Sequence, residues 1–494
     1  MDAYDKKIRP AAVEVQPVPQ DEERQSFQQS PISPIAPDFN GSSRPTGISG
    51  LILRWTPIIF MVSYFLFSIC IYTLLPEEGV KVFWFLYLTI GTLLAGTTVL
   101  EAYDGQSLVT SARKAVAKTA KAGWQEDLTL PYVELVVVET LNGGYERIRA
   151  LRETITYPEE KLRVTVLPEH GDDTELLNHL CQNQDRQSGL LPEITAIFGA
   201  ADSPHPHALR HAVKRLTTDK KIDIVQSRSV LTWPSGVPAV RATYSALTSL
   251  LHDTSFGLLL PGRTITWGLP LSHGNAIYAR TSVLQNAARS LHGMSHRHNG
   301  PALGFAALAQ NTKAAYDLSV ITYTECPSTF RGCCHMQIYA AAQWAACVPW
   351  LCLVFTKARQ PVETKASMDA SAKLPARTLK QRLCILLTLL LRPLASHSIL
   401  QYFSLSLALL FTHAPSSAAD FSKLIFFPYP ISIWLIVSGL VCLAGTVAMA
   451  FSAASEFSPP GWTSPFVLLL WPFMVLAGAF MEVYGQIGVF LGAF

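Results

Sequence analysis

The hydrophobic positions of the chain form long uninterrupted runs towards both ends and shorter runs in the middle. Residues 51–75 and 82–100 are each long enough to cross a hydrocarbon core of about 30 Å, and both are nearly free of charge. They predict a transmembrane hairpin of two helices over residues 51–100. Apolar runs return later in the chain, at residues 338–355, 384–411, 424–451 and 466–483. The pattern predicts a membrane protein with a different kind of region in its middle.

The basic residues favour one orientation of the hairpin. They flank its outer ends, whereas the connecting turn holds two glutamates and one lysine, so the positive-inside rule keeps both ends in the cytosol. We therefore expect residues 101–337 to be a cytosolic domain. The basic loop at 356–382 also prefers the cytosol, which conflicts with a full crossing by residues 338–355. We expect that run to be an interfacial or re-entrant helix, and about three transmembrane helices in 383–494. The total is five spans, with six as the alternative.

Composition agrees with this class of protein and excludes others. Hydrophobic residues make up 49% of the 494 positions and charged residues 15%, with a formal net charge of +3. Nothing in this balance indicates nucleic-acid binding. Residues 1–50 are rich in Pro, Gln and Ser, and they predict a disordered cytosolic tail. Such a tail makes an endomembrane or plasma-membrane location plausible.

The period of the pattern changes in the middle region. Residues 133–138 are a β-branched run that ends before Asn142-Gly143-Gly144, which is typical of a buried parallel strand leading into a turn. A helix, a strand, a helix and a strand are then predicted at residues 145–155, 162–167, 174–181 and 194–198. This β-α-β-α-β order predicts a Rossmann-like α/β domain with a mostly parallel sheet. Its ligand crevice is expected beyond the carboxyl ends of the strands.

Six segments of this region carry short motifs in a fixed order. They read VVVETLN (136–142), YPEEKLRVTVLPE (157–169), ITAIFGAAD (194–202), IVQSR (224–228), GNAIYAR (274–280) and TECPST (324–329). The set resembles the motifs of the family-two glycosyltransferases, the membrane-bound inverting enzymes that include the cellulose, chitin and hyaluronan synthases. The resemblance covers the whole middle region.

The resemblance implies a GT-A-like cytosolic domain joined to transmembrane helices. Such a protein transfers a sugar from a cytosolic nucleotide-sugar donor to a lipid, a glycan or a hydrophobic small molecule at the bilayer. Carried over by motif, the residues expected to bind the nucleotide-sugar are Asn142, Glu169 and Asp202. Those expected on the acceptor side are Asn275 and Trp344.

Inverting sugar transfer needs a divalent cation, Mg²⁺ or Mn²⁺, held by carboxylates beside the leaving diphosphate. The family's metal pair falls on Ala200 and Asp202, so one acid is missing and one is kept. Asp202, His205 and His207 together could hold a metal, since a turn can bring imidazole and carboxylate together. The alternative for this Ser-Pro-His-Pro-His stretch is a plain polar loop.

The reaction also needs a base to deprotonate the attacking hydroxyl. The family's base is expected within residues 294–303, where this chain has no acid. His292, His296 and His298 occupy that place, and a histidine can accept a proton near neutral pH. The alternative is an exposed loop.

Two hypotheses therefore remain for the function. One is an active membrane-bound glycosyltransferase. The other is a catalytically inactive pseudoenzyme, a family-two scaffold that acts as a partner or regulator. A transporter is a weaker third hypothesis, because the predicted spans lack paired charges.

Overall fold

The structure is a computed structural model. It describes residues 48–122, 130–139, 149, 151–168, 174–182, 192–199, 202–232, 247–269, 276–291, 299–310, 312–327, 329–355, 377–412, 416–426, 429–454 and 464–490. All of them belong to the larger of two units of the chain, residues 39–494. The predicted tail lies outside the described residues except for its last three positions, which begin helix α2 (Ile48–Leu74).

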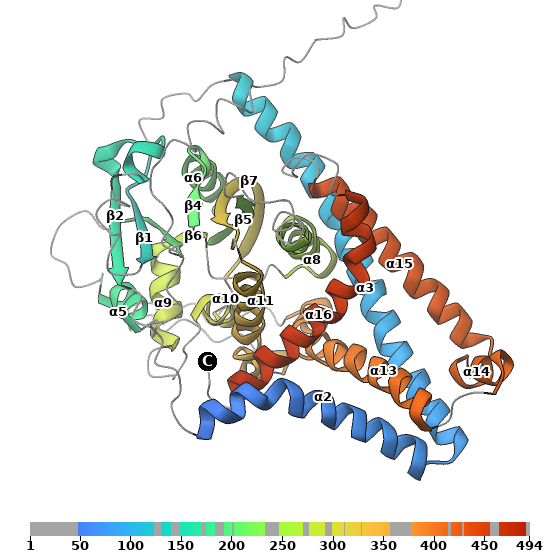
Figure 1. Ribbon diagram of the computed structural model, residues 1–494. Helices are drawn as coiled ribbons and strands as arrows, with labels where there is room; N and C mark the ends of the chain where they lie inside the picture. The colour runs from blue at the N-terminus through green and yellow to red at the C-terminus, as the bar shows by residue number, and fades with distance from the viewer. Residues whose placement is uncertain are drawn as a thin grey trace, which may run out of the picture. The chain divides into compact units, whose positions relative to one another are not determined.

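A seven-stranded sheet with the order β2-β1-β3-β6-β5-β7-β4 forms the middle region (Figure 1). Its strands are β1 (Val133–Glu139), β2 (Leu162–Pro168), β3 (Ile194–Phe198), β4 (Asp202–Pro204), β5 (Ile224–Thr232), β6 (Ile277–Arg280) and β7 (Ala314–Glu325). Strand β1 pairs in parallel with both β2 and β3. The three strands that the sequence predicted here therefore form and pair in parallel.

The sheet is mixed: five strands run in one direction, and β6 and β4 run against them. The β1–β2, β1–β3 and β5–β7 pairs are parallel, whereas β3–β6, β5–β6 and β4–β7 are antiparallel. The sequence pattern could not reveal this, since a buried apolar run specifies a strand and not its direction.

The sheet is also curled. Only residues 199–201 separate β3 from β4, so the end of β3 and the start of β4 lie within about 14 Å of each other. The two strands are four places apart in the sheet, which would be about 19 Å in a flat sheet. Curling therefore brings Asp202, at the start of β4, back towards the carboxyl end of β3.

Helices cover both faces of the sheet. One face packs against α5 (Thr174–Gln182), α9 (Thr281–Leu291) and α10 (Asn299–Ala309), and the other against α6 (Ala208–Thr218) (Figure 1). Side chains alternate between the faces along each strand, as a period of two requires. In β1, for example, Leu135 and Val137 face the α6 side, whereas Val136 faces the opposite core. The result is a three-layer α/β domain.

Three stretches of described helix are long and apolar enough to cross a membrane: Glu77–Ala112, Leu379–Thr412 and Ile431–Phe451. A fourth is formed if α11 (Phe330–Ala345) and the 3₁₀ helix η3 (Val348–Val354), which bend by 43°, make one span. The described helices that follow η3 are α12 (Leu379–Leu386), the π-helix η4 (Leu387–Leu391), α13 (Arg392–Thr412), α14 (Ala418–Ile425), α15 (Ile431–Ala454) and α16 (Ser464–Phe490). Five spans, a cytosolic domain and a re-entrant helix remain predictions.

Helix α3 (Glu77–Ala122) links the hairpin to the sheet domain. Its 46 residues extend about 70 Å, more than twice the thickness of a hydrocarbon core. It lies beside α15 and beside α8 (Leu260–Trp267) (Figure 1). Two glycines let the backbones touch: a Cβ on Gly105 would lie 2.1 Å from the Leu258 carbonyl oxygen, and one on Gly262 would lie 1.6 Å from that of Glu101.

A buried ion pair joins the same two helices. The Nε and Nη2 atoms of Arg263 donate to the two carboxylate oxygens of Glu101, each at 3.1 Å, and the indole of Trp267 donates to Glu101 at 3.0 Å. Arg263 is only 2% exposed. Glu101 lies just beyond the predicted span of residues 82–100, and its partner is far away in the sequence, so the pair was not predicted.

Replacing Gly262 with Ala should separate α3 from α8, because the new methyl group would collide with the Glu101 carbonyl. We expect the free energy of unfolding to fall by about 2 kcal/mol or more. Thermal unfolding of the detergent-purified protein measures this. Gly91→Ala is the matched control, since a Cβ at Gly91 meets nothing within 4 Å. Equal unfolding temperatures for the two variants would contradict the backbone contact.

Candidate active site

Asp202 is a buried carboxylate at the point where β3 gives way to β4. It is 6% exposed. Its Oδ2 accepts a hydrogen bond from the Gly199 backbone N–H at 3.0 Å, and its Oδ1 accepts one from the Thr324 hydroxyl at 2.6 Å. The antiparallel β4–β7 pairing places Asp202 directly opposite Thr324. Hydrogen bonds of this kind compensate the cost of burying a carboxylate and fix its orientation.

A chain of hydrogen bonds continues away from Asp202. The Thr324 hydroxyl lies 2.9 Å from the Ser229 hydroxyl on β5, and the Ser229 hydroxyl lies 2.9 Å from Nε2 of His252. His252 belongs to the helical residues 247–253, and its ring stacks on Phe256. Four polar side chains from four different elements are thus linked, and we call them the Asp202 network: Asp202, Thr324, Ser229 and His252.

At the far end of the network, His252 and the adjacent residue Asp253 have pKa values that are shifted in opposite directions. Burial lowers the pKa of His252 to about 3, so its imidazole is neutral at physiological pH. Burial raises the pKa of Asp253 to about 7, although the charge of Arg228 opposes this. Arg228 is 3% exposed, and a Cβ on Gly257 would lie 3.6 Å from its guanidinium.

Two irregularities in the backbone lie next to these residues. The register of the β5–β7 pair shifts between Ser227 and Arg228. Ser227 lies opposite Asp317, but Arg228 lies opposite Ile321, so residues 318–320 of β7 have no partner in this register. A bulge of this kind redirects the side chains that follow it. The π-helix η2 (Thr254–Leu259) begins immediately after Asp253. Both features are over-represented at functional sites.

The structure does not bring Asp202, His205 and His207 together as a metal site. Nδ1 of His205 accepts from the backbone N–H of His207 at 3.2 Å, and Nδ1 of His207 lies 2.8 Å from the Thr156 hydroxyl. Throughout the described part of the chain, no three His, Cys, Asp or Glu side chains form a group that could hold a metal ion. The two imidazoles serve local contacts of the β4–α6 connection.

The other predicted site residues divide into two groups. Trp344 lies on α11, where it packs edge-on against Phe305 in the core beside α10, and its acceptor-side role remains a prediction. Six residues lie outside the described part of the chain: Asn142, Glu169, Asn275, His292, His296 and His298.

The sequence contains partial signals for the residues that the predictions missed. Thr324 is the first residue of the sixth motif. Ser229 comes directly after the fourth motif, which ends at Arg228. Neither was assigned a role, because only the fold reveals that β7 lies between β4 and β5. His252 had no signal, since it belongs to none of the motifs.

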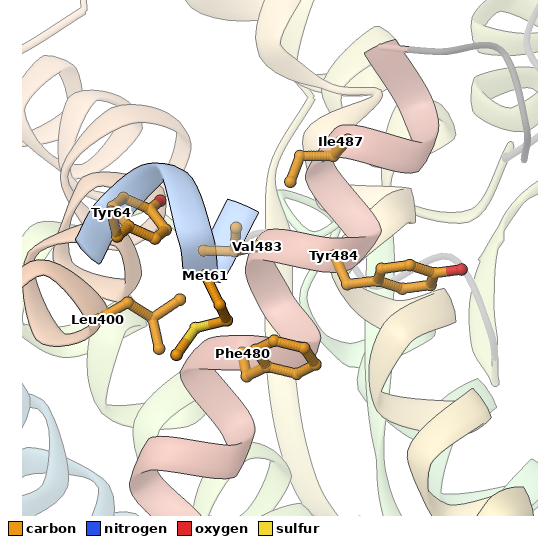
Figure 2. A pocket seen from close by; sticks show the side chains of 7 residues that line it. All are labelled: Met61, Tyr64, Leu400, Phe480, Val483, Tyr484 and Ile487. Atoms are coloured by element: carbon orange, nitrogen blue, oxygen red, sulfur yellow. The ribbon is translucent and has the colours of Figure 1, made fainter. Parts of the chain in front are cut away.

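A small apolar cavity of about 10 Å³ lies in the helical region, away from these residues. Figure 2 shows its lining side chains, which come from α2, α13 and α16: Met61, Tyr64, Leu400, Phe480, Val483, Tyr484 and Ile487. It has room for about one water molecule. No residue of the Asp202 network lines it.

Comparisons with known proteins leave the family open. Neither a protein-family model nor a curated protein matches the chain. Among solved structures, the chain is similar to the mannosyltransferase PcManGT from Pyrobaculum calidifontis in complex with GDP-Man and Mn²⁺. The identity is 16% and the TM-score 0.38, over 74% of this chain and 100% of that chain. A similarity at that level carries no argument about the activity of this chain.

Replacing Asp253 with Asn should change how stability depends on pH. A folded-state pKa of about 7 means that the folded protein holds a proton that the unfolded chain releases above about pH 4. The contribution of Asp253 to stability therefore falls as the pH rises from about 4 to about 7. The variant lacks this fall, so its stability relative to the parent should rise by up to about 1.4 kcal/mol per pH unit in that window.

Thermal unfolding of both proteins at pH 5, 6 and 7 measures the effect. Glu160→Gln is the control, because Glu160 is an exposed carboxylate of the same domain. A difference between the Asp253→Asn variant and the parent protein that stays constant over this range would contradict the buried, protonated state of Asp253.

Proposed function

We propose that the chain is a membrane-bound glycosyltransferase-like protein. It binds a cytosolic nucleotide-sugar at the carboxyl ends of the central strands and transfers the sugar to a lipid, a glycan or a hydrophobic small molecule at the bilayer. The observation that carries the proposal is the fixed carboxylate of Asp202 at the carboxyl end of β3. In open α/β sheets, ligands bind beyond these strand ends.

The arrangement of the motif segments supports the proposal. All seven strands contain residues of the six segments that resemble family-two motifs. The third and sixth segments meet where Asp202 accepts from Thr324, and the fourth and fifth meet where the Ser227 hydroxyl donates to the Ala276 carbonyl at 2.7 Å. Segments that are far apart in the sequence are therefore neighbours in the sheet. Motif matches that arose independently by chance would not be expected to lie side by side.

The donor chemistry fits a cation that arrives with the nucleotide better than a resident metal. Mg²⁺ is commonly held by one or two carboxylates together with substrate phosphates. Asp202, which Gly199 and Thr324 orient, is the residue that would hold Mg²⁺ or Mn²⁺ beside the substrate phosphates. When bound, such a cation neutralises the charge of the leaving diphosphate. Gly199 and Thr324 keep the carboxylate oriented.

The membrane side of the proposal rests on α3. This helix is apolar enough to span a bilayer over Glu77–Ala112, and the Glu101–Arg263 pair fastens it to α8 beside the sheet. A site on the sheet is then held close to the surface of the membrane. A hydrophobic acceptor dissolved in the bilayer suits that position, and the basic flanks of the hairpin favour the cytosolic side.

One observation favours the alternative of an inactive scaffold. Within the described residues, Asp202 belongs to no group of three His, Cys, Asp or Glu side chains that could hold a metal ion. The sequence also has no acid within residues 294–303, where the resemblance expects the base. A protein of this kind would bind the nucleotide without turning it over, and act as a partner or regulator.

Nucleotide binding tests the proposal directly. We expect the protein in lipid nanodiscs to bind UDP or GDP in the presence of Mn²⁺, and Asp202→Asn to weaken this binding by about tenfold or more, because a charged contact is worth about 1.5–3 kcal/mol. Isothermal titration calorimetry measures both dissociation constants. Asp420→Asn, which changes an exposed acid on α14, is the control.

A hydrolysis assay with a panel of UDP- and GDP-sugars separates the two functions. Turnover that requires Mg²⁺ or Mn²⁺ and is lost in Asp202→Asn supports the active enzyme. Binding without turnover supports the scaffold. A parent protein that binds neither nucleotide refutes both.

A further inference from the structure

The Asp202 network has a definite direction, which follows from the number of hydrogens each group can donate. An ionised carboxylate only accepts, so Thr324 gives its single hydroxyl hydrogen to Asp202. The Thr324 oxygen must then accept from Ser229. The hydrogen of Ser229 is now used, so the contact with His252 requires His252 to donate from Nε2.

We propose that Thr324, Ser229 and His252 form a positioning network that holds the Asp202 carboxylate in one orientation, with His252 fixed as its Nε2–H tautomer. This inference rests on the proposed function, because the orientation matters for a ligand bound at Asp202. None of the three residues needs to touch that ligand. Each acts through its neighbour.

The geometry supports a role beyond filling space. Every donor in the network points towards Asp202, and hydrogen bonds in such a chain strengthen one another. The bonds also cross from β4 through β7 and β5 to residues 247–253, so they tie a helix to the site. Apolar packing could hold the same elements together, but it would not direct a chain of hydrogen-bond donors towards Asp202.

Several charged and titratable groups face the network from the elements packed around it. Tyr278 reaches the Asp202 side from β6, and burial together with the charge of Asp202 raises its pKa. Arg228 on β5 and Asp253 lie at the His252 end. His205 follows β4 and has its ring beside Tyr323.

Two sets of variants test the network. Thr324→Val, Ser229→Ala and His252→Leu each remove one link, whereas Thr324→Ser and His252→Gln each keep a donor. We expect the first set to weaken binding of Mn²⁺–UDP or Mn²⁺–GDP by about tenfold, and the second to stay within about threefold of the parent. Thr232→Val is the matched control, because its hydroxyl donates to the backbone of Thr324 at 3.4 Å and not to the carboxylate.

The donor-keeping variants separate positioning from general support. A residue that only supports the fold would weaken binding in any substitution, whereas a positioning residue tolerates a replacement that keeps its donor. Binding weakened by about tenfold in Thr324→Ser and His252→Gln as well would overturn the proposal.

A double-mutant cycle tests the network without any nucleotide. Thr324→Val and His252→Leu do not share a direct contact, yet removing either breaks the same chain. We expect the double variant to lower the unfolding temperature by clearly less than the sum of the single variants. Additive shifts overturn the network. Sub-additive shifts support it, and if the parent then binds no nucleotide, the fault lies with the proposed function and not with the network.

Discussion

The contact between α3 and α8 is the constraint on which the rest of the structure depends. Gly262 lets the backbones of the two helices touch, Gly105 does the same against Leu258 of the adjoining η2, and the Glu101–Arg263 pair joins α3 to α8. A buried ion pair gains little net stability, because desolvation offsets most of the attraction. Its value here is geometric: a forked guanidinium meets a carboxylate in one register only. The pair therefore fixes which turn of a 46-residue helix faces the sheet domain.

This register is transmitted to the candidate site through a short path. Leu258, which touches Gly105, belongs to the π-helix η2, and η2 continues directly from the residues that carry His252 and Asp253. The position of α3 thus sets the position of His252. From His252 the hydrogen bonds lead to Asp202. The helix that is apolar enough to span a membrane and the carboxylate at the strand ends are parts of one connected arrangement.

The sequence allowed the regular parts of the fold to be predicted and hid the parts that depend on distant pairing. Strands β1, β2 and β3 were found to within one residue, because β-branched runs between turn residues are a local signal. The antiparallel direction of β4 and β6 was not predicted, since the direction of a strand depends on partners elsewhere in the chain. The Glu101–Arg263 pair joins residues 162 positions apart, and the Thr324–Asp202 bond joins residues 122 apart. No local pattern contains such information, which is why Asp202 was found by resemblance and its partners were not.

The polar interior of β5 contributes to the surroundings of the single carboxylate that stands where the resemblance leads one to expect two. Gln226, Ser227, Arg228 and Ser229 are all buried in a strand whose neighbours are largely apolar. Buried polar residues cost stability unless they are paired, so they persist where function needs them. A second carboxylate beside Asp202 would repel it and raise the cost of keeping both ionised. Hydrogen-bond donors bring no such repulsion: they stabilise a single charge and leave part of it available for a cation carried by a diphosphate. In this chain, neutral donors from two strands, one helix and the Gly199 backbone form the hydrogen bonds that lead to this single carboxylate.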